Sequence, residues 1–541
     1  MKKSIWILCI MGFLITCTRQ PVYDVVIYGG TSAGVIAAVQ VDRLGKSAVL
    51  IEPGDHLGGL TSGGLGRTDT GDKSVIGGMS REFYQRLKQY YDDASAWTYE
   101  NPQDYSGYQK EADAIWGFEP HVAEQIYNEM LEETDVVVLK NERLDLSSGA
   151  TVENGRIQAV LLESGKSVYG RMFIDAGYEG DLLARAGVSY AVGRESNDTC
   201  NETLNGVQKR KSVNHQLKPG VDPFVVPGDP SSGILPNVQA GDPGEDGQGD
   251  HRVQAYCFRM CLTDVPENRL PYPKPDDYDE LEYELLFRNF EAGENSLPWL
   301  PGLMPNRKTD TNNRTGFSTD YIGKNYDYPE ADYATRDSIV AAHERYQKGL
   351  MWTLANHPRV PQHIRDEIAR WGPAGDEFVD TGNWPHQLYI REARRMIGQY
   401  VMTENDCRRN RIVDDPIGLG SYNMDSHNCQ RYITAEGYAR NEGNIEVSPG
   451  GAYLISYRAI TPQQEEIENL LVPVCLSASH IAYGSIRMEP VYMILGQSAA
   501  TAAVLAIDDQ IAVQEVEYDE LRKQLLRDKQ VLDLPAQSTR Q

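Results

Sequence analysis

The sequence predicts an α/β protein in which a Rossmann-like nucleotide-binding domain is interrupted by an inserted domain of mixed α+β structure. Three observations favour this fold. A strand–helix–strand pattern with a glycine-rich turn opens the chain, apolar strands and a helix of small residues near the C-terminus complete it, and the segment between them is rich in Pro, Gly, Asp and Tyr. A chain of 541 residues is long enough for two closely joined domains.

The opening pattern is the βαβ unit that binds dinucleotides. The first strand is expected at Tyr23–Tyr28, which is apolar and rich in β-branched residues. A helix begins at Gly34 and ends near Gly45, which suits its C-terminal cap. A second strand, residues 47–51, ends on Glu52. In such a unit a pyrophosphate lies at the helix N-terminus, and the acid accepts hydrogen bonds from ribose hydroxyls.

The turn of this unit departs from the G-x-G-x-x-G fingerprint, because Thr31 stands where the second glycine belongs. A threonine keeps the turn if its φ is negative, and its hydroxyl is then available to a phosphate. The complete βαβ spacing maintains the prediction of a dinucleotide site. The residues of this unit expected to bind the cofactor are Gly29, Gly30, Thr31, Ser32, Ala33, Gly34 and Glu52.

A second glycine-rich segment, residues 58–66, suits a backbone pressed against a flat ligand, although it could also be a flexible loop. Flavoproteins often lay such a segment along the isoalloxazine ring, and nicotinamide enzymes do not need it. Further strands are expected at residues 136–139, 172–175 and 469–477.

A long helix is expected at residues 488–506. A proline suits its first turn, and its N-terminus can stabilise negative charge on a reduced flavin. The sequence therefore predicts FAD as the cofactor. The additional residues expected to contact FAD are Gly59, Leu60, Thr61, Gly64, Val138, Asp175, Gly177, Asp181, Glu489 and Pro490.

On these residues the chain resembles a family of FAD-dependent oxidoreductases whose bacterial members are often exported and labelled xanthan lyase. The matching segments include YGGTSAG, GGLTSGGLGRTD, FIDAGYEGDLLARAGVSYAVGRE and LVPVCLSASHIAYGSIRMEPVYMILGQSAATAA. The family accepts threonine in place of the second glycine. The fold expected is the FAD-binding type of glutathione reductase and fumarate reductase. Some wider relatives bind iron–sulfur clusters, but their cysteine spacings are absent here, and no metal site is predicted.

The domain boundaries follow from these segments. The chain divides into a signal peptide (residues 1–17), the first part of the FAD domain (22–195), an inserted substrate domain (196–420), the second part of the FAD domain (421–510) and a helical tail (511–541).

The N-terminal segment, MKKSIWILCIMGFLITC, predicts export, because two lysines precede an apolar run too short to span a bilayer. It resembles a bacterial lipoprotein signal, whose cleavage leaves Cys17 as the lipidated N-terminus; plain secretion is the alternative. We expect a periplasmic or cell-surface protein with Cys17 as its only membrane anchor, and an exported chain can form disulfides among its other cysteines. A formal net charge of −26 repels phosphate backbones, so nucleic acid is not an expected partner.

Oxidation of an alcohol by a flavin requires a base for the hydroxyl proton, and histidine is the natural choice near neutral pH. His480 follows the strand expected beside the flavin, with Ser477 and Ser479 available to orient it. His427, close to Asp425 in sequence, is the rival. Either histidine could instead satisfy local hydrogen bonds.

Basic residues offer further candidates. The spacing of Arg391, Arg394 and Arg395 places them on one face of a helix. They could clamp an anionic substrate such as a uronic acid, but salt bridges to nearby acids such as Glu392 are favoured. Arg487 is expected to lie against the flavin and stabilise its anionic reduced form, or else to pair elsewhere.

These features together predict an FAD-dependent oxidoreductase that removes hydride from an alcohol or related carbon of a small substrate. A carbohydrate-derived substrate is implied by the resemblance alone. Two alternatives remain open: a polysaccharide lyase acting by β-elimination, and a surface binding protein whose flavin site is structural or lost.

Overall fold

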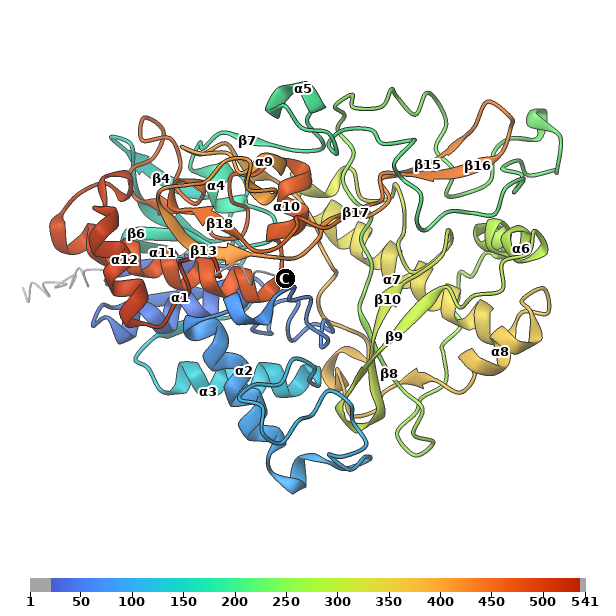
Figure 1. Cartoon of the computed structure of the whole chain (residues 1–541), viewed down its shortest axis with the longest axis horizontal. Helices are drawn as coiled ribbons and strands as arrows, with labels where there is room; N and C mark the ends of the chain where they lie inside the picture. The colour runs from blue at the N-terminus through green and yellow to red at the C-terminus, as the bar shows by residue number, and fades with distance from the viewer. Residues whose placement is uncertain (1–20, 536–541) are drawn as a thin grey trace, which may run out of the picture.

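The computed structural model describes residues 21–535, and Figure 1 shows their arrangement. The expected export signal and the anchoring Cys17 lie outside the described residues, so both stay predictions.

A seven-stranded sheet forms the core of the nucleotide-binding half. Its strands, in sheet order, are β3 (Val137–Leu139), β2 (Ala48–Ile51), β1 (Val22–Tyr28), β6 (Ser167–Asp175), β5 (Arg156–Leu161) and β4 (Ala150–Glu153), with β19 (Leu470–Leu471) also paired to β6. Strands β1, β2, β3, β6 and β19 are parallel, and β5 and β4 extend the sheet antiparallel. Because Tyr28 is in register with both Ile51 and Asp175, β1, β2 and β6 end at the same edge.

The two faces of this sheet are buried in different clusters, as the alternation of side chains along a strand requires. Val25 and Ile27 pack in the cluster that contains helices α1 (Ser32–Arg43) and α11 (Glu489–Asp509). Val26 and Tyr28 point the other way, into a cluster with β5 and α4 (Asp181–Arg185). Helix α11 lies directly against α1: a Cβ added at Gly496 would be 2.3 Å from the carbonyl oxygen of Ala33.

Helix α11 is long and apolar enough to cross a membrane, although the sequence pattern had suggested no such segment after the signal. Within the protein, 94% of its most apolar window is buried, which is typical of a core helix. Helices α2 (Gly78–Tyr91) and α12 (Tyr518–Arg527) pack against α11, α3 (Pro120–Glu132) packs against α1, and α10 (His480–Ile486) packs against a later strand, β14 (Met424–Ser426).

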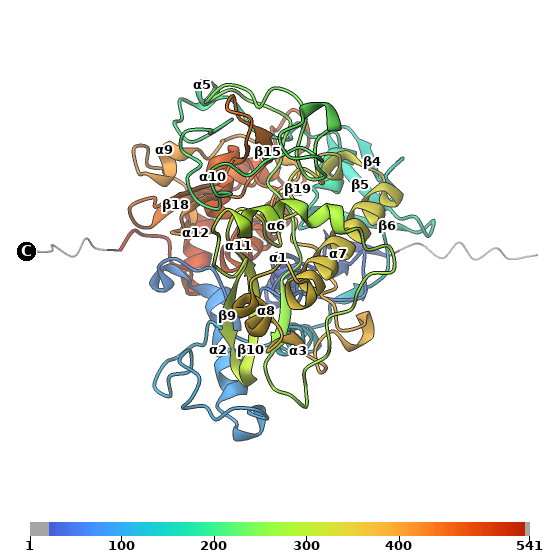
Figure 2. The same cartoon turned by 90° about the vertical axis from the view of Figure 1, so that its right-hand side faces the viewer.

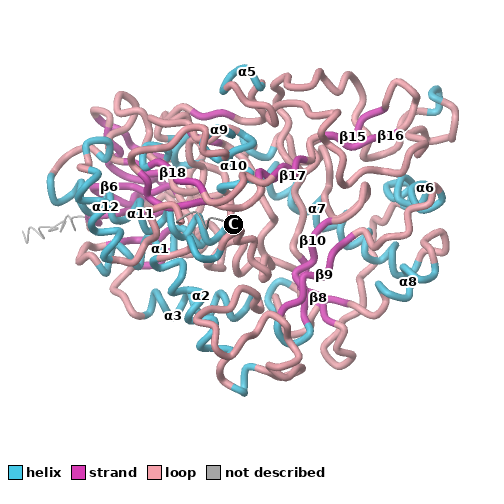
Figure 3. The backbone as a smooth tube through the Cα atoms, viewed as in Figure 1, coloured by secondary structure: helices cyan, strands magenta, loops and turns pink. Residues whose placement is uncertain are grey.

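The second half of the molecule is built around a smaller antiparallel sheet, in the order β11-β8-β10-β9. Figure 1 shows it on the right, and Figure 2 shows its helices from that side; Figure 3 shows how much of this half consists of loops. Its elements are β8 (Met260–Thr263), α6 (Glu284–Glu291), β9 (Trp299–Met304), β10 (Lys308–Asn313), α7 (Tyr333–Asn356), α8 (Gln362–Ile368) and β11 (Gly372–Pro373).

The chain returns to the nucleotide-binding half earlier than the expected residue 421. Strand β12 (Arg395–Met396) pairs with β7 (Tyr190–Ala191), and β13 (Pro416–Gly420) pairs with β18 (Tyr453–Ser456) beside α11. The elements that follow β13 then reach back toward the second half. They are β14 (Met424–Ser426), β15 (Gln430–Ile433), β16 (Ala439–Glu442) and β17 (Ile445–Val447). Two short helices, α5 (Asn197–Cys200) and α9 (Glu404–Cys407), precede β13 in the chain.

Two expectations differ from the structure. The strand expected at residues 469–477 is reduced to the two residues of β19, since Pro473 lacks the amide hydrogen that a longer ladder needs. The six cysteines of the described chain are free, and five of them are buried: Cys257, Cys261, Cys407, Cys429 and Cys475.

Candidate active site

The turn between β1 and α1 has the conformation that the sequence requires. Thr31 has φ −64° and serves as the N-cap of α1, so the condition of a negative φ is met. Its hydroxyl donates to the carbonyl oxygen of Ala176 (2.8 Å) and accepts from the amide of Gly34 (3.3 Å). The hydroxyl thus joins the turn to the end of β6, and in this structure its proton is directed to a carbonyl within the protein. Gly34 is required here, because an added Cβ would be 1.9 Å from the carbonyl oxygen of Gly29.

A cleft of about 250 Å³ lies at the edge where β1, β2 and β6 end, which is where parallel α/β sheets bind their ligands. Gly29, Thr31, Glu52 and Gly177 line it from the sheet side. The carboxylate of Glu52 accepts from the amides of Gly30 (2.7 Å) and Gly54 (2.6 Å). Burial raises the pKa of this carboxyl to about 7, although the two hydrogen bonds from backbone amides act in the opposite direction.

The opposite wall of the cleft comes from distant segments that carry no motif. It includes Arg143, Tyr333, Arg336 and His386. Neither ring nitrogen of His386 has a hydrogen-bond partner among residues 21–535, although both are buried. Its ring stacks on that of His56 at 4.0 Å, and burial together with this neighbour lowers the pKa of His386 to about 4.

The two expected acids after β6 are engaged within the protein. Asp175 accepts from the amides of Gly177 (3.2 Å) and Leu183 (2.8 Å), and burial raises its pKa to about 7. Asp181 lines the cleft, but its carboxylate pairs with Arg336 (2.6 Å) and Arg394 (2.8 Å). Asp175 thus fixes the turn after β6, and Asp181 attaches Arg336 of α7, in the second half of the molecule, to the cleft.

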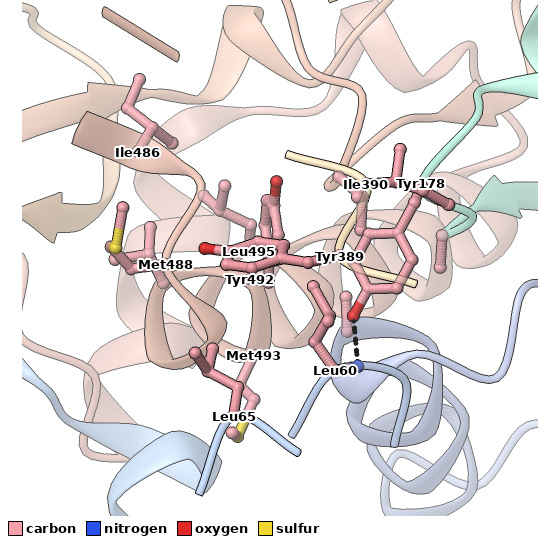
Figure 4. Packing of buried hydrophobic residues seen from close by; sticks show 14 of the residues in the cluster. Leu60, Leu65, Tyr178, Tyr389, Ile390, Ile486, Met488, Tyr492, Met493 and Leu495 are labelled. Atoms are coloured by element: carbon pink, nitrogen blue, oxygen red, sulfur yellow. Dashed lines mark hydrogen bonds between the residues drawn. The ribbon is translucent and has the colours of Figure 1, made fainter. Parts of the chain in front are cut away.

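The glycine-rich loop is pressed against protein on several sides. A Cβ at Gly64 would be 1.9 Å from the carbonyl oxygen of Arg259, and one at Gly59 would be 2.3 Å from the hydroxyl of Tyr178. Leu60 is buried and donates its amide to the Tyr178 hydroxyl (2.8 Å), as Figure 4 shows. The alternative of a merely flexible loop does not fit these contacts.

The carboxylate of Glu489, at the start of α11, accepts hydrogen bonds from three hydroxyl groups near the turn between β1 and α1. It accepts from Ser32 (2.5 Å), Thr61 (3.0 Å) and Tyr178 (2.9 Å), and burial raises its pKa. The neighbouring Pro490 occupies the first turn of α11, as expected, and Val138 lies in β3 opposite Leu50. Ser32 and Ala33 have no exposed surface.

The donor set of the cleft fits an adenine dinucleotide. A strand-terminal acid stands beside glycine amides at the edge of a parallel sheet, and an unpartnered imidazole lies opposite. The residues that line the cleft and would hold the nucleotide are Gly29 and Thr31 of the turn together with Glu52, Gly177 and His386.

A second, polar cavity of about 170 Å³ contains the histidine that the sequence analysis ranked as the rival base. His427 lines it, and its Nδ1 lies 2.7 Å from a carboxylate oxygen of Asp320. Its Nε2 is 3.6 Å from Asp425, too far for a hydrogen bond. Burial alone would raise the pKa values of both acids, but nearby positive charge, chiefly His427, holds that of Asp320 well below its usual range and that of Asp425 at about 2.

Two of the expected arginines support this histidine. Arg391 donates to the other oxygen of Asp320 (3.0 Å) and stacks on Tyr389 at 4.1 Å. Arg487 donates to Asp425 (2.9 Å) and to the Tyr389 hydroxyl (2.8 Å). Arg391 and Arg487 therefore hold the residues around His427, and Arg487 forms the pairing that the sequence analysis gave as its alternative role.

The arginine cluster does not lie on a helix. Residues 391–394 are extended and lead into β12, so successive side chains point to different partners. Arg391 pairs with Asp320, Arg394 with Asp181 and Arg395 with Glu392. The salt bridges favoured by the sequence analysis are confirmed, and the shared helical face was wrong.

His480 lies deep in the core, as the first residue of α10, with 2% of its surface exposed. Its Nδ1 is 2.7 Å from Glu392 and its Nε2 is 3.0 Å from Ser426. The expected orienting serines have other partners: Ser479 donates to Glu202, and Ser477 accepts from the amide of Gly398. With both nitrogens engaged, His480 is placed to support β14, and of the two expected bases only His427 faces a cavity.

One short segment connects the cofactor cleft with the polar cavity. His386, Gln387 and Leu388 line the cleft, and Tyr389 and Arg391 line the cavity. Tyr389 also belongs to the apolar cluster around Leu60, Tyr178 and Tyr492 (Figure 4). The sequence does not indicate this role of the segment, because its contacts with the two spaces depend on partners far away in the chain.

One group of described residues has the spacing of metal ligands: Glu119, His121 and Glu377. The ammonium group of Lys308 lies 2.7 Å from both Glu119 and Glu377. A buried lysine thus supplies the positive charge at this position.

A family model described as FAD dependent oxidoreductase matches residues 24–525. A comparison with curated proteins found no match.

Among solved structures, L-proline dehydrogenase from P. horikoshii is similar over 33% of this chain, with 17% identity and a TM-score of 0.23. L-amino acid deaminase from Proteus vulgaris is similar over 34% of this chain, with 14% identity and a TM-score of 0.24. The chain covers 59% and 54% of those two proteins, less than two thirds of their length. Since the family model spans nearly the whole described chain, this protein belongs to the FAD-dependent oxidoreductase family, with FAD as its cofactor.

Proposed function

We propose that this oxidoreductase removes hydride from an alcohol, or a related carbon, of a small carbohydrate-derived substrate held in the polar cavity. The observation that carries the proposal is the segment 386–391, which lines the cofactor cleft at one end and the His427 cavity at the other. FAD supplies the hydride acceptor when bound. Residues 196–420 would then serve largely as the substrate domain of a flavoprotein of the glutathione-reductase or fumarate-reductase type.

Residues in and around the polar cavity accept the substrate proton, orient the histidine that takes it and bind substrate hydroxyls. Asp320 accepts a hydrogen bond from the protonated Nδ1 of His427. The opposite nitrogen, Nε2, is then available to take the hydroxyl proton of the substrate. Arg391 holds Asp320 from the other side and keeps it ionised. Asn312 and Asn313 line the same cavity and offer amide groups to substrate hydroxyls.

The proposal is tested by an anaerobic substrate screen that follows bleaching of the flavin absorbance, with two histidine variants. His427→Gln should slow flavin reduction by about 10²–10⁴-fold, the usual contribution of a general base. His480→Gln is the matched control, and it should lower stability while the FAD-loaded fraction keeps its rate. The reverse pattern would overturn the assignment of the base.

The two alternatives predict different outcomes. Formation of unsaturated uronate by FAD-free protein, seen as ultraviolet absorbance, would favour a lyase. A tightly bound flavin that no alcohol reduces would favour a binding protein.

We also propose that the protein is exported and anchored through a lipid on Cys17. The support is the order of charged, apolar and cysteine residues in the first 17 positions. Mass spectrometry of the mature N-terminus tests this, and an intact Met1 in the purified cellular protein would contradict it.

A further inference from the structure

A larger chamber of about 490 Å³ adjoins the His427 cavity, and we call it the outer chamber. The two spaces share Asp69 and Tyr422 in their walls. Arg67, Lys73 and the half-exposed Leu303 line the outer chamber on its solvent side. A substrate that reaches His427 through this chamber would contact these residues with the part that does not react.

The outer chamber is positively charged in a strongly acidic protein. The chain has 78 acidic and 52 basic residues, yet Arg67 and Lys73 form no ion pair with any residue between 21 and 535, and they outnumber Asp69, the one acid in the chamber wall. Arg81 lies close by, over the ring of Trp116 that also faces Lys73, but it is neutralised by Asp113 (2.6 Å). Burial and the neighbouring Arg67 and Arg81 lower the pKa of Lys73, as expected for a cation without a counter-ion.

The His427 cavity, which adjoins the outer chamber, offers no unpaired arginine to an anion. Its arginines are already paired, Arg391 with Asp320 and Arg259 with Asp310, so neither is free to hold an anion. Asp69 at the junction and Asn312 and Asn313 farther in offer hydrogen-bond acceptors and amides, groups that bind hydroxyls. Together the two spaces suit a molecule with a carboxylate at one end and hydroxyl groups at the other.

We infer that the outer chamber binds the carboxylate of a sugar acid through Arg67 and Lys73, while a hydroxyl-bearing carbon of the same molecule reaches His427. This inference rests on the proposed function and names its substrate class. With FAD bound, the carbon–hydrogen bond would break with the hydrogen and its electron pair leaving as hydride to FAD, the hydroxyl proton would pass to His427, and the carbon–oxygen bond would become a carbonyl.

The experiment titrates oxidised FAD-loaded protein with galacturonate, digalacturonate or galactose and follows the perturbation of the flavin spectrum. Galacturonate should bind at least about tenfold more tightly than galactose at low ionic strength, and the difference should shrink as salt is added. Arg67→Gln and Lys73→Gln should each weaken galacturonate binding by about tenfold and leave galactose binding unchanged. Lys523→Gln is the matched control, because it removes the same charge from the exposed face of α12.

The outcomes separate the two proposals. Equal binding of galactose and galacturonate, no binding of either at millimolar concentration, or unaltered discrimination in both variants would overturn the outer chamber as a carboxylate site. If galacturonate binds as expected but reduces no flavin, the chamber stands and the oxidation of this class of substrate fails. Tighter binding of digalacturonate than of galacturonate would identify the end of an acidic oligosaccharide as the ligand, and equal binding would identify a free sugar acid.

Discussion

The threonine in the nucleotide-binding turn gives the sharpest test of how this turn is stabilised. Thr31→Val replaces the hydroxyl by a methyl group of nearly the same shape. The variant loses the N-cap bond to Gly34, about 1 kcal/mol, and leaves the buried carbonyl of Ala176 without its donor, about 1–3 kcal/mol. The free energy of unfolding of the FAD-free protein should therefore fall by about 2–4 kcal/mol.

Thr31→Ser is the matched control, because it keeps the hydroxyl and removes only a methyl group, at about 1 kcal/mol. Both proteins are unfolded with urea in the absence and presence of FAD, and the dissociation constant of FAD is measured by fluorescence. If the hydroxyl acts only within the protein, the constant for Thr31→Val should change by no more than about threefold, under 1 kcal/mol.

Two results would refute this reasoning. Equal stability of the Val and Ser variants would show that the two hydrogen bonds contribute nothing net. A rise of more than about tenfold in the FAD dissociation constant of Thr31→Val, with unchanged stability of the FAD-free protein, would make the hydroxyl a phosphate ligand instead.

Three further predictions concern buried titratable groups. His386→Phe should raise the FAD dissociation constant about tenfold in fluorescence titrations without lowering the melting temperature of FAD-free protein, because the ring nitrogens have no partner in the described chain; an unchanged constant would contradict this. The pKa of Glu52 is about 7 in the fold and about 4.3 in the unfolded chain, so its ionisation opposes folding. Relative to Glu52→Gln, the wild type should thus lose stability in urea unfolding as the pH rises from about 4.5 through 7, and a difference independent of pH would oppose this. Lys308→Met removes the charge shared by Glu119 and Glu377 and should cost about 3–5 kcal/mol in urea unfolding, whereas a loss below about 1 kcal/mol would show that these acids are neutral.

The nucleotide-binding half could be predicted in detail because its signals are local. Strand β1 follows from an apolar run rich in β-branched residues, helix α1 from the apolar stretch between Gly34 and Gly45, and Gly34 itself from the close approach of helix and strand. The helix α11 was expected within three residues of its observed ends for the same reason. The strand expected at 469–477 was too long, because its pairing with β6 ends at Leu471 and Pro473 lacks the amide hydrogen to continue it.

The candidate site could be predicted only as a set of residue types. The sequence favoured His480 over its rival His427, because neighbouring serines suggested an orientation for His480 that the structure does not adopt. The arginines at 391–395 have helical spacing, but each one is drawn to a different acid, so the segment is extended.

The sequence by itself determined the βαβ unit, the cofactor class and the residues that could take or hold a proton, because these depend on spacing along a few turns of chain. Only the tertiary structure decided which of them work together. Asp320 lies 107 residues before His427, and Arg391 reaches the same carboxylate from 71 residues away. A buried polar side chain must find its partner wherever packing brings one within hydrogen-bond distance, so such pairs are chosen by the fold as a whole.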